Sequence, residues 1–438
     1  MALQPGTSAA QPSPQDGAKH SLFPAGHLVP FVLVTFLFFL WGIPNSMNDV
    51  LIRQFMKTFE LSRFEAGLVQ SAFYMGYFVM AIPAALLMRR AGYKAGLIAG
   101  LLLLGGGATL FWPAALVGKY GFFLAALFVM ASGLSFLETA ANPFIAQLGD
   151  PASSERRLNF SQAFNPLGTI VAALGGTVFI FSGIELSRTE IAARIANGTY
   201  AGYLRFETLR VIRPYLAIAA VAFVWAALIW RTKFPPVQGE TSAGGETGSY
   251  NELFRYRHFL LAVLAQFLYV GAQVGTWSYF ISYTQDYAHL PEKTAGFLLT
   301  GTLAMFGIGR FGSAYLMRWV SPARLMGTYA VASVALLFFA VFRPSPAGMW
   351  CVFVTSLFMS LMFPTIFALG LKDLGPNTKI GGSLLVMAIV GGAVLPPLMG
   401  YIAECGHSLA LAYAVPMVAY VFIALYSFFG AQPARRGG

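Results

Sequence analysis

Two carboxylates lie within long apolar stretches of the sequence, at Asp49 and Glu138. An unpaired charge inside a bilayer is costly, and acidic residues in such positions are functional by default. Burial favours the neutral form of a carboxyl group, so each residue can exchange a proton near neutral pH. A proton-coupled carrier requires such a group. We predict that Asp49 is the main proton carrier and that Glu138 couples protonation to substrate binding, with a static polar contact as the alternative.

Polar and aromatic side chains recur at helical spacing around both acids. Trp41, Asn45 and Asn48 share one face of a helix that also carries Asp49. Amides hydrogen-bond to hydroxyl groups and aromatic rings stack on sugar C–H faces, so the set suits a neutral polyol. The predicted substrate-binding residues are Trp41, Asn45, Asn142, Gln162, Asn165, Gln273 and Trp277.

Each of these residues has a structural alternative. Intramembrane amides often only hold helices together, and Trp277 could be an anchor at the membrane interface. Arg310 also lies in an apolar stretch. For Arg310 we favour gating or helix packing over substrate binding.

The composition excludes a soluble protein. Of 438 residues, 57% are hydrophobic and 10% are charged, whereas soluble domains carry about 25% charged residues. The mean hydropathy is +0.66. The net charge of +11 fits basic residues that flank membrane spans, so we expect lipid and no nucleic acid as a partner.

The hydropathy predicts an all-α membrane protein of twelve transmembrane helices in two six-helix halves, because each span needs about 20 apolar residues. The expected spans lie near 28–52, 66–88, 95–117, 121–148, 159–183, 211–232, 258–284, 294–317, 324–342, 348–371, 381–403 and 409–430. A polar segment, 185–208, separates the fifth and sixth spans. The predicted organisation is a disordered cytoplasmic tail (1–27), an N-terminal bundle (28–234), a cytoplasmic linker (235–257), a C-terminal bundle (258–430) and a cytoplasmic tail (431–438).

Basic residues set the expected orientation. Sixteen of the 28 Lys and Arg residues fall on the inside if both termini are cytoplasmic, and eleven fall outside. This bias favours cytoplasmic termini. The segments 84–98 and 313–327 resemble each other, as do 142–151 and 363–376. Two parallel six-span repeats are the architecture of major facilitator transporters, whose substrate site lies between the halves.

Several motifs together resemble the L-fucose permease family of the major facilitator superfamily. They are FFLWGIPNSMNDVLIRQF (38–55), EAGLVQSAFYMGYF (65–78), LETAANPF (137–144), LNFSQAFNPLG (158–168), YVGAQVGTWSYF (269–280) and FPTIFALGLKDLG (363–375). The resemblance implies proton-coupled sugar uptake that involves Asp49 and Glu138, with the sugar near Trp41, Gln162 and Asn165. Ser46 and Phe363 replace an Asn and a Tyr of the fucose carriers. Glucose, galactose or an amino sugar therefore remain open as substrates.

We therefore expect a monosaccharide:proton symporter that works by alternating access, as a monomer in the cell (inner) membrane. A sodium-coupled or facilitative sugar transporter of the same fold is the alternative. A membrane-embedded transferase is a more distant one, because the sequence has no His-rich metal cluster and no nucleotide-binding P-loop. We expect no enzyme activity, no cofactor and no metal. The co-transported ion would be a proton, with sodium as the other candidate.

Overall fold

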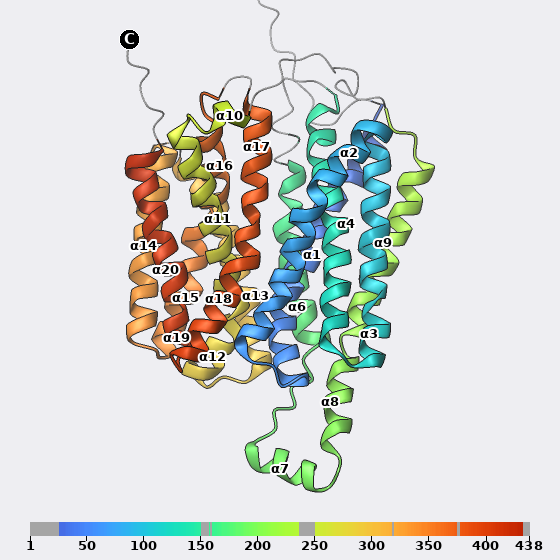
Figure 1. Ribbon diagram of the computed structural model, residues 1–438, viewed down its shortest axis with the longest axis vertical. Helices are drawn as coiled ribbons and strands as arrows, with labels where there is room; N and C mark the ends of the chain where they lie inside the picture. The colour runs from blue at the N-terminus through green and yellow to red at the C-terminus, as the bar shows by residue number, and fades with distance from the viewer. Residues whose placement is uncertain are drawn as a thin grey trace, which may run out of the picture.

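The computed structural model describes residues 26–149, 157, 160–235, 250–317, 319–374 and 377–431. Within these ranges every regular element is a helix (Figure 1). The first half contains α1 (Leu28–Thr58), α2 (Arg63–Thr109), α3 (Phe111–Val117), α4 (Tyr120–Gln147), α6 (Phe164–Phe179), α7 (Arg188–Ala196), α8 (Tyr200–Leu209) and α9 (Ile212–Arg231). The second half contains α10 (Tyr250–Leu253), α11 (Arg257–Ser278), α12 (Phe280–Ala288), α13 (Glu292–Leu316), α14 (Pro322–Phe342), α15 (Pro346–Met359), α16 (Met362–Leu371), α17 (Thr378–Met387), η3 (Ala388–Val390), α18 (Gly391–Cys405), α19 (Leu409–Ala412), α20 (Ala414–Leu425) and η4 (Tyr426–Gly430).

Eleven stretches of the described residues are long and apolar enough to cross a membrane. The predicted fifth span, 159–183, is not among them because its main helix, α6, has 16 residues, or about 24 Å of length. A turn at Ala163 separates α6 from the helical residues Phe160–Gln162. This helix packs between α1 and α13, and it completes the six-helix first half that the hydropathy predicted.

Several predicted spans are divided by local breaks. Gly92, between the predicted spans 66–88 and 95–117, adopts φ 76°, a conformation that glycine tolerates best, and it marks the kink that separates these two spans within α2. Tyr279 separates α11 from α12, and Ser360 with Leu361 separates α15 from α16. Irregular backbone at membrane depth is tolerated where it is buried in protein or lines a cavity. The breaks at Tyr279 and at Ser360 with Leu361 therefore indicate parts of these spans that face protein or a cavity and not lipid.

The predicted polar segment 185–208 contains two helices, α7 and α8, rather than a plain loop. Ser187 caps α7 together with Glu190 in a capping box, and its hydrogen bonds hold the pKa of Glu190 below the usual value. The hydropathy placed Glu207 in this loop region, yet its side chain is fully buried. Sequence reasoning missed this burial because Glu207 contacts residues of α1 that are about 150 positions away.

We call the end of the molecule that carries α7 and α8 the α7 end, and the opposite end, with α10, the linker end (Figure 1). Most of the predicted linker and nearly all of both predicted tails lie outside the described residues. Hydrogen bonds and ion pairs between the described parts of the halves involve residues 49–71 and Glu185 of the first half. These residues lie toward the α7 end, so this end is closed.

Candidate transport cavity

A cavity of about 210 Å³ lies between the two halves. Its walls come from α1, α2, α4 and α6 of the first half and from α11, α13, α16 and η3 of the second. Seven of the nine residues predicted from the sequence line it: Trp41, Asn45, Asp49, Glu138, Asn165, Gln273 and Trp277. The structure therefore gathers residues from both halves around one polar space.

Asp49 lies at the contact between the halves. Its side chain is 3% exposed, and its Oδ1 accepts hydrogen bonds from Gln70 Nε2 at 3.0 Å and from Ser278 Oγ at 3.1 Å. Gln70 Nε2 also donates to Ser278 Oγ at 2.9 Å. Gln70 belongs to the first half and Ser278 to the second, so the carboxylate of Asp49 accepts a hydrogen bond from each half.

Glu138 borders two spaces. It lines the central cavity and also a smaller cavity of about 30 Å³, which Tyr77, Ser135 and Thr139 line as well. The smaller cavity has the size of roughly one or two water molecules. A carboxyl group in this position can exchange a proton between the central cavity and the smaller one.

Asn142 and Gln162 do not line the cavity, in contrast to the prediction that they bind substrate there. Asn142 Nδ2 donates to the carbonyl oxygen of Glu138 at 3.0 Å, one turn back on α4. Gln162 Nε2 donates to Asn142 Oδ1 at 3.1 Å. In this conformation the two amides bond to each other and to the backbone of α4.

Asn45 and Asn165 are placed by bonds to the backbone of α1. Asn45 Nδ2 donates to the carbonyl oxygen of Trp41 at 3.3 Å, within the same helix. Asn165 Nδ2 donates to the carbonyl oxygen of Phe38 at 3.2 Å, which joins α6 to α1. Each amide thus fixes its own position in the cavity wall through its donor group.

Trp277 lies in the wall of the cavity, within the second half. Its Nε1 donates to Ser356 Oγ at 3.0 Å, and Ser356 Oγ lies 2.5 Å from Thr302 Oγ1. The ring meets Phe306 edge to face, with centroids 5.1 Å apart. This support fixes the orientation of the indole, as a ring that stacks on a ligand requires.

Gln70, Tyr74, Tyr77 and Arg310 also line the cavity, although none of them is among the predicted substrate-binding residues. Gln70, Tyr74 and Tyr77 follow i, i+4, i+7 spacing on α2, the same rule that found Trp41 and Asn45 on α1. Arg310 lines the cavity with its guanidinium 5.0 Å from the centroid of Phe306. Arg310 Nε also donates to the carbonyl oxygen of Ser360 at 3.5 Å. This contact fits the favoured packing role, and the position in the wall keeps substrate binding open for Arg310.

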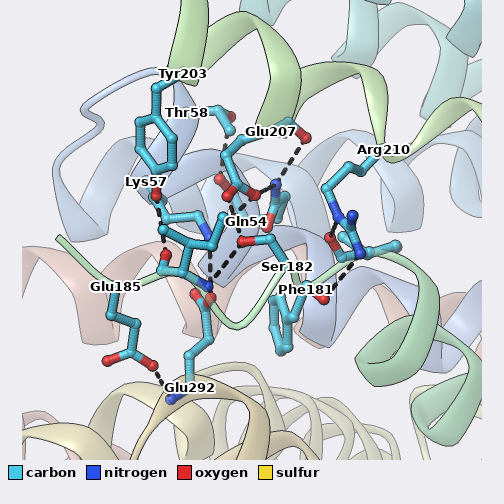
Figure 2. A network of polar contacts seen from close by, with 12 residues as sticks. Gln54, Lys57, Thr58, Phe181, Ser182, Glu185, Tyr203, Glu207, Arg210 and Glu292 are labelled. Carbon is cyan, nitrogen blue, oxygen red and sulfur yellow. Dashed lines mark hydrogen bonds and ion pairs between the residues drawn. The ribbon is translucent and has the colours of Figure 1, made fainter. Parts of the chain in front are cut away.

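A second polar cluster, which the sequence analysis did not predict, closes the α7 end (Figure 2). Lys57 Nζ lies 3.0 Å from Glu292 Oε2 and 3.2 Å from Glu207 Oε2. Both glutamate side chains are fully buried. Arg53 Nε lies 3.3 Å from Glu292 Oε1, an ion-pair contact without hydrogen-bond geometry. Glu292 belongs to the second half, so the cluster joins the halves.

Hydrogen bonds complete this ion cluster. Gln54 Nε2 donates to the carbonyl oxygen of Glu207 at 2.9 Å, and the Ser182 hydroxyl donates to the Glu207 carboxylate. The backbone N–H of Glu292 donates to Glu185. No group of three metal-ligating side chains occurs among the described residues. We interpret the cluster as a contact between the halves.

A membrane-spanning helical bundle in two halves, with a polar cavity between them that is closed at one end, defines a transport protein. A family model described as Major Facilitator Superfamily matches residues 31–383. The L-fucose-proton symporter of Escherichia coli (strain K12) is 41% identical over 93% of this chain and 94% of its own length. The chain belongs to the major facilitator superfamily.

Other relatives agree with this assignment. A glucose/galactose transporter of Brucella abortus (strain 2308) is 35% identical over 91% of this chain and 93% of its own. A crystal structure of a major facilitator transporter in the outward conformation matches with a TM-score of 0.69 at 40% identity, over 93% of this chain and 99% of that one. These relatives are transporters, which agrees with the prediction that the chain is not an enzyme.

Proposed function

We propose that this protein is a monosaccharide:proton symporter that works by alternating access of its two halves. The central cavity binds the sugar through Asn45, Asn165, Gln273 and the ring of Trp277. Asp49 carries the proton, and Glu138 couples protonation to sugar binding. The observation that supports this proposal most is the position of Asp49, a carboxyl group of the first half that reaches the second half at the cavity.

The relatives support the substrate class and the co-ion. Two curated relatives, from Escherichia coli and Haemophilus influenzae, are L-fucose-proton symporters at 41% and 36% identity. The glucose/galactose transporters are 35% identical or less. Ser46 and Phe363, which replace an Asn and a Tyr of the fucose carriers, both lie in the cavity wall. These departures keep glucose, galactose and an amino sugar open as substrates beside L-fucose.

We infer that the linker end faces the cytoplasm and that both termini are therefore inside. We also propose that the protein lies in the inner membrane. The bias of basic residues supports this orientation. With the α7 end closed, the structure then represents a state of the cycle that is closed to the outside. The arrangement of two halves around one cavity is complete in a single chain, so we expect a monomer surrounded by lipid.

The test is uptake of radiolabelled L-fucose, D-galactose and D-glucose by purified protein in liposomes under an imposed pH gradient. We expect accumulation of at least one sugar and alkalinisation outside that depends on the sugar. A membrane potential adds about 2.3 kcal/mol per charge per 100 mV, so one co-transported proton is enough to concentrate the sugar. In Asp49→Asn, accumulation should cease while exchange of sugar across the membrane survives. Continued accumulation by this variant would reject the assignment of Asp49.

Sodium coupling is the alternative within transport. Replacing sodium by choline at constant pH should leave accumulation unchanged if the proton is the co-ion. Loss of accumulation in choline would establish sodium instead, and equal rates without any ion gradient would establish facilitation. If no monosaccharide moves in any of these conditions, the proposal of sugar transport fails.

A further inference from the structure

The contact between Asp49 and Ser278 joins the two halves at the cavity. Asp49 lies on α1 of the first half, and Ser278 ends α11 of the second half. Gln70, the other donor to Asp49, lies on α2 and belongs to the same half as Asp49. A movement that separates the halves at the α7 end therefore removes Ser278 from Asp49 but leaves Gln70 in place.

The hydrogen bonds show how the Ser278 hydroxyl is oriented. Gln70 Nε2 donates to Ser278 Oγ at 2.9 Å, and Ser278 Oγ in turn donates to Asp49 Oδ1 at 3.1 Å. A serine hydroxyl has one proton to donate, so accepting from Gln70 directs that proton toward the carboxylate. Hydrogen bonds donated to a carboxylate favour its charged form. Ser278 therefore favours the charged form of Asp49 only while the α7 end is closed.

We propose that Ser278 is the residue of the second half that couples the charge on Asp49 to closure of the α7 end. Closure supplies the extra donor and promotes release of the proton. Protonation weakens the contact and promotes opening. A hydrogen bond to a charged group changes the proton affinity roughly tenfold or more, and by linkage the proton changes the opening equilibrium by the same factor. The inference rests on the proposed function for the role of Asp49.

Other ionisable groups face the same cavity and need to be separated from Asp49. They are Tyr74 and Tyr77 on α2, Glu138 on α4 and Arg310 on α13. Of these, Glu138 is the other carboxyl group. A Glu138→Gln variant therefore belongs in every comparison.

The experiment measures the distance between the halves at the α7 end without any sugar. Spin labels at Val117 and Arg343, both exposed near that end, report the distance by pulsed electron resonance after Cys351 and Cys405 are replaced by Ser. In the otherwise unchanged protein we expect the long-distance population to grow as the pH falls from 8 to 5. Asp49→Asn should remove this response, and Glu138→Gln should retain it.

The decisive variant is Ser278→Ala, which should reduce the pH-dependent change in the ratio of open to closed protein roughly tenfold. Ser278→Thr keeps a hydroxyl and should keep the response. Ser282→Ala is the matched control, because Ser282 is buried one turn further along and its hydroxyl has no partner; its response should equal that of the unchanged protein. If Ser278→Ala does not fold, Gln70→Leu, which removes the donor that orients the hydroxyl, should weaken the response in the same direction.

The inference is overturned if Ser278→Ala retains the full pH response, if the unchanged protein has none, or if Glu138→Gln abolishes the response and Asp49→Asn does not. Because no sugar is present, these outcomes are independent of the uptake experiment. A protein that transports sugar with protons but keeps its pH response in Ser278→Ala would retain the proposed function and lose this inference.

Discussion

Lys57 Nζ lies 3.0 Å from Glu292 Oε2, so a lysine of the first half is paired with a buried glutamate of the second. The same ammonium group lies 3.2 Å from Glu207 Oε2. Lys57 and Glu207 both belong to the first half, so Glu292 joins this pair only while the halves meet at the α7 end. Burying a charge without a partner is costly, so we expect closure of the α7 end to require Lys57 as the partner of Glu292.

Replacing Lys57 with Met should therefore destabilise the closed α7 end. Breaking a buried ion pair by removing one partner costs about 3–5 kcal/mol, and opening relieves this cost for Glu292, the glutamate that the second half contributes. We expect a larger long-distance population between labels at Val117 and Arg343 and slower uptake. Lys119→Met is the control, since Lys119 is exposed and has no part in the cluster. An unchanged distance distribution in Lys57→Met would refute a role of the cluster in closure.

Glu138→Gln should make sugar binding insensitive to pH. The amide resembles the protonated acid, and we propose that protonation of Glu138 favours sugar binding. The affinity of the variant at pH 8 should then equal that of the unchanged protein at low pH, while accumulation driven by a pH gradient falls at least tenfold. Equilibrium binding of the transported sugar between pH 5 and 8 measures this. A pH dependence equal to that of the unchanged protein would exclude Glu138 as the coupling residue.

The sequence predicted the fold well because a chain with this many long apolar stretches has few alternatives to a bundle of transmembrane helices. It also singled out Asp49 and Glu138 by the contrast between their charge and their apolar neighbours, and both residues line the cavity. It missed Glu207 and Glu292, which local hydropathy assigns to loops, because their burial depends on the docking of the two halves. It placed Gln162 at the sugar, whereas the described structure bonds it to Asn142. Contacts between distant segments are not encoded in local periodicity.

Ser356 should control sugar affinity through Trp277 without touching the sugar. In Ser356→Ala the indole N–H loses its acceptor, and an unmet hydrogen bond of this kind costs about 1–3 kcal/mol. We expect KM for the transported sugar to rise roughly fivefold or more, with little change in the maximal rate, because the ring is less firmly oriented. Thr355→Val is the matched control, since the neighbouring Thr355 hydroxyl bonds within its own helix to the carbonyl oxygen of Cys351. Equal KM values in the two variants would contradict the positioning role.

Gly168 lies where α6 crosses α1, and the cavity depends on this crossing because Asn165 lies one turn earlier on α6. A methyl group at Gly168 would overlap the carbonyl oxygen of Phe39, and one at Gly42 would lie 2.5 Å from the carbonyl oxygen of Asn165. Gly168→Ala must therefore separate the two helices, at a cost of about 1–3 kcal/mol, and move Asn165 away from Phe38. We expect a lower melting temperature and weaker sugar binding in this variant. Gly175→Ala on the same helix has open space around the added methyl group and should leave both unchanged. If the two alanine variants behave alike in thermal unfolding and in binding, the close crossing of α1 and α6 does not set the position of Asn165.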